Sequence, residues 1–265
     1  MTTLADSELV RARWRRALHG HALDDVRRAD FALGGLAPRL REPTVQVLLL
    51  PPDPEGEVFS FDDELWAWID AQKTVAVGGR TIRFGDQSYP TAHAAALVRG
   101  YGNREPWSSY LAVHRSGAIE LGLGDRGGWE RQNREGETVR MFNLISIVAY
   151  TWAMLMFSAA LNERDARSSP RQLTIALRGT RGALLGNVGE GWAEPDSFQN
   201  TVSGCLEEHL LWHLSIDEPP DDAGQKQLAF GVGDRIEDAW GVTESRYLAR
   251  VGDRDGQLDV RRIAE

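Results

Sequence analysis

VRMFNLISIVAYTWAMLMFSAAL, residues 139–161, is an apolar run with no charged side chain from Met141 to Leu161. The sequence predicts a helix over residues 139–162. At about 1.5 Å per residue, such a helix is about 30 Å long. This length suffices to cross either a domain of this size or the hydrocarbon core of a bilayer. The helix therefore belongs either to a protein core or to a membrane span.

The charges that flank this helix favour the core. Both signs occur on both sides, so no charge asymmetry would orient a span. The charged residues are Arg134, Glu135, Glu137 and Arg140 before the helix and Glu163, Arg164, Asp165 and Arg167 after it. The neighbouring segments read as strands, which need a hydrophobic element to pack on. We expect no membrane contact, and a single-span membrane protein is the alternative.

Several shorter segments show strand or hairpin patterns. TVQVLLL at 44–50 is a β-branched and leucine run that is typical of a buried strand. Hairpins are predicted at 110–123, around Ser116-Gly117, and at 172–188. The other expected elements are a helix at 61–71, strands at 80–84 and 227–232, a short helix at 234–240 and a hairpin across 252–256.

Residues 85–106 read as rich in loops, except for an alanine-rich stretch at 92–98, and residues 124–138 read as polar and exposed. Residues 202–216 read as helix or strand, with helix favoured. Together the segments predict an α+β fold in which mixed or antiparallel hairpins pack around one long buried apolar helix, residues 139–162. We expect an N-terminal helical segment at 1–38 and a single α+β domain at 39–265. An internal boundary could fall at 162–170, where the sequence is polar and turn-like.

Composition narrows the classes of function. The net charge of −9 disfavours wholesale wrapping of nucleic acid, although the Arg11–Arg28 region keeps nucleic-acid binding open. Cys205 is the only cysteine, so no intramolecular disulfide can form. The N-terminal residues lack the apolar core of a signal peptide, and we expect a cytoplasmic protein.

Candidate catalytic residues are few. Cys205, His209 and His213 are spaced four apart, so on a helix they would share one face and could bind a metal ion. A metal-dependent hydrolase or nuclease is therefore one alternative. The glycine-rich run at 181–192 lacks the Gly-Lys-Ser/Thr of a phosphate-binding loop. We expect no cofactor, and the sequence leans away from an enzyme without excluding one.

Aromatic and basic residues point to binding. The chain has nine tryptophans, and Trp107, Trp129 and Trp192 lie in segments rich in glycine, proline or acids, which we expect at the surface. Exposed aromatics are enriched at interfaces. Residues 5–18 predict an amphipathic helix whose basic positions include Arg11, Arg15 and Arg16. We therefore expect a non-enzymatic binding or regulatory module that contacts a protein partner or itself.

Three stretches together carry a resemblance to a known family. They are PTVQVLLLPP at 43–52, YLAVHRSGAIE at 110–120 and QLTIALRGTRGALL at 172–185. Their order resembles the region that follows the ATP- or DNA-binding domain of bacterial Schlafen-like (AlbA-type) proteins. The resemblance implies an accessory part of a bacterial intracellular system, beside a nucleic-acid-sensing or defence ATPase. It carries over no catalytic residue.

Overall fold

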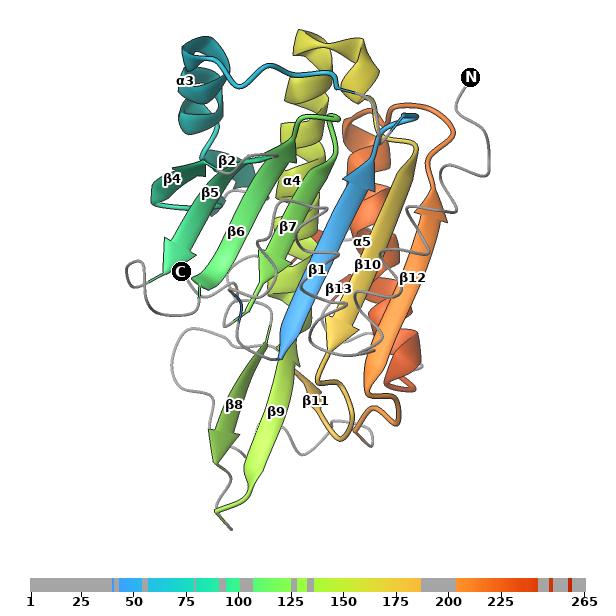
Figure 1. The fold of residues 1–265 in the computed structure, drawn as a ribbon. Coiled ribbons are helices and arrows are strands. Elements are labelled where there is room, and N and C mark those ends of the chain that lie inside the picture. Colours follow the sequence, from blue (N-terminus) through green and yellow to red (C-terminus); the bar gives the residue numbers. More distant parts are fainter. Residues whose placement is uncertain are drawn as a thin grey trace.

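A seven-stranded antiparallel sheet is the centre of the fold in the computed structural model (Figure 1). Its strand order is β12-β10-β1-β7-β6-β5-β4. The strands are β1 (Thr44–Leu50), β4 (Gln87–Pro90), β5 (Ala94–Gly100), β6 (Trp107–His114), β7 (Ile119–Leu123), β10 (Gln172–Arg178) and β12 (His209–Ser215). The structure describes residues 40, 43–53, 57–78, 80–90, 94–100, 107–124, 128–132, 136–186, 204–242, 248–249 and 257–258.

Three smaller sheets surround the large one. β2 (Thr74–Val77) pairs with β3 (Arg80–Arg83), and β13 (Leu248–Ala249) pairs with β14 (Gln257–Leu258). β9 (Thr138–Asn143) lies between β8 (Gly128–Gln132), to which it is antiparallel, and β11 (Leu184–Gly186), to which it is parallel. The described part of the chain is therefore an α+β fold with mostly antiparallel strands.

Two long helices cover one face of the large sheet (Figure 1). They are α4 (Leu144–Arg164) and α5 (Asp222–Ala239), which pack against each other. The shorter α3 (Asp63–Ala71) contacts β5, and the short 3₁₀ helix η2 (Ala166–Ser168) follows α4. Side chains from the sheet, α4 and α5 form one continuous hydrophobic core.

The long apolar helix is a core helix. By length and composition α4 could cross a membrane, but 78% of its most apolar window is buried inside the protein. Its Phe157 ring packs against the rings of Trp68 and Phe84, at centroid distances of 5.4 and 5.9 Å. The prediction of one long buried apolar helix at the centre of an α+β fold is confirmed.

The predicted start of this helix is wrong by five residues. Residues 139–143 belong to β9, and α4 begins at Leu144. Asn143 has an extended backbone, and its side-chain oxygen accepts a hydrogen bond from the Ser146 amide at 3.1 Å. This N-cap satisfies a first-turn amide and fixes where the helix starts. Apolar residues continue through the cap, so hydrophobicity alone hides the boundary.

Some of the other predicted helices and strands are confirmed, and others are wrong. The strands at 44–50 and 80–84, the helix at 61–71 and the 110–123 hairpin are confirmed. The 172–188 hairpin is wrong because β11 pairs with β9 and not with β10. In the loop-rich segment 85–106, β4 is a strand that was not predicted, and β5 contains most of the alanine-rich stretch. The polar segment 124–138 contains β8.

The large sheet buries side chains on its second face as well. Leu48, Tyr110 and Glu120 point away from the helices and are almost completely buried. Leu40 packs on this face near Trp107, with which it forms a β-bridge. Burial on both faces explains why β1 reads as a nearly continuous apolar run and not as an alternating one.

Candidate functional site

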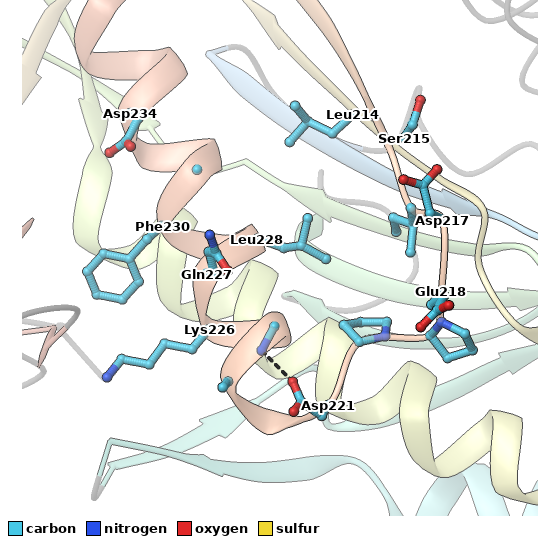
Figure 2. A pocket seen from close by; sticks show the side chains of 16 residues that line it. Leu214, Ser215, Asp217, Glu218, Asp221, Lys226, Gln227, Leu228, Phe230 and Asp234 are labelled. Carbon is cyan, nitrogen blue, oxygen red and sulfur yellow. Dashed lines mark hydrogen bonds between the residues drawn. The ribbon is translucent and has the colours of Figure 1, made fainter.

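An open groove lies between α5 and the segment that leads into it from β12 (Figure 2). Its volume is about 1100 Å³. One side is formed by Leu214, Ser215 and residues 216–221, and the other by residues of the first four turns of α5, through to Asp234. β12 is the last strand at this end of the described sheet, so the groove lies at the sheet's edge.

Backbone and capping bonds hold the wall of this groove in place. The Ile216 amide donates to the Arg171 carbonyl at 3.0 Å, and the Arg171 guanidinium donates to the Asp217 carbonyl. Asp221 caps α5 by accepting a hydrogen bond from the Gly224 amide at 2.8 Å. The loop is therefore tied both to β10 and to the helix that follows it.

The groove is acidic at its rim and apolar beneath. Four carboxylates line it, from Asp217, Glu218, Asp221 and Asp234, and Lys226 is the one basic residue in the lining. In Figure 2 the Lys226 side chain extends away from the β12 side, and its ammonium lies 6.0 Å from the centroid of the Trp152 ring.

Apolar surface is supplied from both sides of the groove by the half-buried side chains of Leu214 and Leu228. Ile216 is buried beside them, and Figure 2 shows the Phe230 ring on the side of α5 that faces away from β12. Such a surface is complementary to a segment that carries positive charges next to apolar groups.

The groove lining carries few of the side chains that nucleophilic catalysis uses. No histidine or cysteine is among the described residues that line the groove. Ser215 supplies a hydroxyl, but no hydrogen bond from it to a groove carboxylate is seen within the described lining. Nucleophilic catalysis needs such a nucleophile–base contact. Elsewhere in the described ranges, no group of three or more histidine, cysteine, aspartate or glutamate side chains could hold a metal ion.

A second polar cluster is buried on the face of the sheet opposite the helices. The Tyr110 hydroxyl donates to one oxygen of Glu120, and His114 Nε2 lies 3.1 Å from the other oxygen. Gln46 Nε2 donates to the Tyr110 hydroxyl at 3.3 Å. Glu120 is only 1% exposed. Both carboxylate oxygens are engaged and closed off from solvent, so this cluster ties β1, β6 and β7 together and offers no access to a substrate.

Gly122 creates the space for this cluster. It pairs with Tyr110 on β6 and with Gln46 on β1. A Cβ at position 122 would lie 2.2 Å from Cε1 of the Tyr110 ring. The tyrosine therefore crosses over the glycine and reaches the side chain on the third strand. A glycine inside a strand often marks such a close approach.

Trp107 does not lie where the sequence predicted. It is 4% exposed in β6, and its ring packs against Tyr89 and Tyr110 at centroid distances of 5.2 and 5.9 Å. The expectation that Trp107 is a surface anchor is wrong. The glycine- and proline-containing residues just before it suggested a loop, but the strand starts at the tryptophan itself.

Of the other residues predicted to contact a partner, the structure describes only Trp129. Trp129 is half-buried in β8, opposite Met141. Trp192 lies outside the described residues, as do Arg11, Arg15 and Arg16. Their roles in binding therefore stay predictions.

The structure separates the proposed metal ligands. Residues 209–215 form strand β12, so the favoured helix at 202–216 is wrong. Along a strand, four residues span about 13 Å, which is too far for His209 and His213 to bind one ion. His213 Nδ1 lies 2.9 Å from the Thr174 hydroxyl, and Cys205 is buried against Ala183. The helical face required by the metal-dependent alternative does not exist, and on the strand the two histidines are too far apart to share a metal ion.

The groove itself was not predicted. Its acids lie in two segments, a proline-rich loop and a helix interior, and each segment alone looks like ordinary solvated surface. The PPDD motif at 219–222 was one available signal, because Asp221 after prolines is a typical helix N-cap. It could have located the start of α5 but not the groove.

Fold and site together define an α+β protein with an acidic, partly apolar groove at the edge of its main sheet. Comparisons of the chain with models of protein families, with curated proteins and with solved structures find no match. The resemblance to Schlafen-like proteins therefore stays a prediction.

Proposed function

We propose that the protein is a non-enzymatic binding module that docks a positively charged, partly apolar protein segment in the groove along α5. The observation that carries this proposal is the arrangement of four carboxylates around apolar side chains at an open groove. Arginine or lysine side chains of a partner would be attracted to the rim. Apolar side chains of the same segment would contact Leu214 and Leu228, which are only half-buried.

The proposal retains the binding role expected from the sequence and changes where the contact is made. Loop tryptophans were the first candidates, and Trp107 is no longer one of them because it is buried. A cytoplasmic location and an accessory role in a bacterial system belong to the same proposal. They rest on the sequence and on the resemblance alone.

Neutralising the groove is expected to weaken binding of a basic amphipathic peptide. The probe is a synthetic helical peptide with leucines on one face and arginines on the other. Asp217→Asn combined with Glu218→Gln removes two exposed rim charges and leaves the Asp221 cap intact. Because exposed charge pairs contribute modestly, we expect affinity to fall by about 3- to 30-fold, measured by fluorescence anisotropy at low salt.

A matched variant controls for overall charge. Glu163→Gln combined with Asp238→Asn changes the net charge equally, and both residues are exposed outside the groove lining. This control is expected to bind the peptide as the wild type does. Equal affinities for the groove variant and the wild type would contradict the proposed function, as would an equal loss in the control.

A further inference from the structure

We infer that the occupant of this groove is the chain's own arginine-rich segment, residues 9–18, bound in cis. The inference rests on the proposed function, because it names a ligand for the same site. Residues 9–18 read LVRARWRRAL, with four arginines and no acid, in a chain whose net charge is −9. The segment lies outside the described residues, so the argument starts from the groove and from the segment's sequence.

Charge complementarity is the first step. The segment carries four guanidinium groups, and the groove carries four carboxylates against one ammonium group. Guanidinium groups bind carboxylates with two parallel hydrogen bonds when the geometry allows. Asp217 and Glu218 are exposed and could each receive an arginine without any burial of an unpaired charge.

Apolar complementarity is the second step. Leu9, Val10, Trp14 and Leu18 recur at helical spacing, so a helix over this segment would present an apolar stripe beside its arginines. The groove offers matching apolar side chains beneath its acidic rim. An amphipathic helix laid into a groove is a common mode of peptide recognition.

The chain is long enough to make this contact within one molecule. Leu40 is fixed by its bridge to Trp107 on β6. β6 and β12 are four positions apart in the sheet, about 19 Å at about 4.8 Å per strand. Trp107 starts β6 and the groove lies at the end of β12, so about 27 Å along the strands brings the separation to about 33 Å. The 22 residues from Leu18 to Leu40 can span up to about 70 Å. The segment can therefore reach the groove with ample slack.

A tethered occupant would regulate access to the groove. A segment joined by a linker of this length has an effective concentration on the order of 1 mM. If the free segment binds with a dissociation constant of about 0.1 mM, an external ligand must compete and binds about tenfold more weakly. The groove would then open fully only to partners that displace the segment.

Competition in the full-length chain tests the inference. Arg11→Gln, Arg15→Gln and Arg16→Gln together are expected to raise the affinity for the leucine–arginine peptide by about tenfold, because the internal competitor is weakened. The control replaces three arginines that pair with acids outside the groove, Arg83, Arg140 and Arg181, by glutamine. The control is expected to leave the affinity at the wild-type value.

The outcomes separate the two proposals. If the N-terminal triple variant binds the peptide as the wild type does, while Asp217→Asn with Glu218→Gln still weakens binding, the inference fails and the proposed function stands. The groove variant also weakens the internal segment, so its effect on peptide binding is read in a chain that carries Arg11→Gln, Arg15→Gln and Arg16→Gln as well. If the groove variant has no effect in that background, the proposed function fails together with the inference. The increase in peptide affinity of the N-terminal triple variant must also be independent of protein concentration. A gain seen only at high concentration would mean that a second copy supplies the segment, and would overturn binding in cis.

Discussion

Replacing Phe157 with alanine is expected to lower the free energy of unfolding by about 3–5 kcal/mol. Phe157 is 1% exposed in the middle of the core that α4 shares with the sheet. The change removes the ring that packs between Trp68 and Phe84. The surrounding elements cannot collapse fully into the space, so a cavity cost adds to the lost burial.

Urea unfolding followed by tryptophan fluorescence measures this loss. Glu163→Ala, an exposed substitution in the last turns of the same helix, is the control and is expected to change stability by no more than about 0.5 kcal/mol. If Phe157→Ala and Glu163→Ala had the same small effect, α4 could not be the helix around which the core is built.

Replacing Glu120 with alanine is expected to cost a similar amount, about 3–5 kcal/mol, for a different reason. The substitution leaves the Tyr110 hydroxyl and His114 Nε2 without the carboxylate that both now contact. Buried polar groups that lose a partner suffer the full cost of desolvation. The loss should appear in the same unfolding experiment.

Glu130→Ala is the matched control for this prediction. Glu130 forms an ion pair with Arg140 at 3.0 Å, but on the surface, where such pairs contribute about 0–1 kcal/mol. A double-mutant cycle with Glu120→Gln and Tyr110→Phe is expected to show a coupling energy of about 0.5–3 kcal/mol. Equal losses for Glu120→Ala and Glu130→Ala, or additive effects in the cycle, would contradict a network that joins three strands.

Local patterns in the sequence predict the elements whose signals do not depend on distant residues. Thr44–Leu50 is recognisable as a strand because it is short, β-branched and bounded by prolines. The hairpin of β6 and β7 is recognisable because Gly117 adopts a positive φ of 83° at the turn, which glycine tolerates. These elements were sufficient to derive the α+β class and the buried helix.

Competing patterns explain the local errors. Leu228, Phe230 and Val232 alternate as in a strand, but the buried residues of α5 recur at helical spacing. They are Gln225, Ala229, Phe230, Val232, Gly233, Ile236 and Glu237. The Asp221 cap then makes one helix of residues that were predicted as a strand and a short helix. Gly179 and Gly182 do form a turn, and both have a positive φ. The strand that follows this turn, β11, pairs with β9 and not with β10, so no hairpin forms.

The features that the sequence did not predict depend on contacts between residues that are far apart in the chain. β11 finds β9 as its partner across more than forty residues, and no local pattern encodes that choice. The groove likewise exists only because α5 turns back beside the end of β12. The buried contact between Glu120 and Tyr110 depends on Gly122, which lies between Tyr110 and Gln46 in the sheet and leaves space for the tyrosine ring. Each of these features requires the sheet order, which single-sequence patterns do not determine.

Hydrogen–deuterium exchange of the full-length chain carrying Arg11→Gln, Arg15→Gln and Arg16→Gln, which weaken the internal competitor, tests the groove most directly when it is measured with and without the leucine–arginine peptide. The amides of Asp217, Glu218, Asp222 and Ala223 lie in the groove loop and in the first turn of α5, where helix amides lack intrahelical partners. We expect the peptide to slow exchange at these amides and to leave the first turn of α3, at Asp63 and Glu64, unchanged. Unchanged exchange in the groove loop, or protection confined to other parts of the protein, would contradict the groove as the binding site.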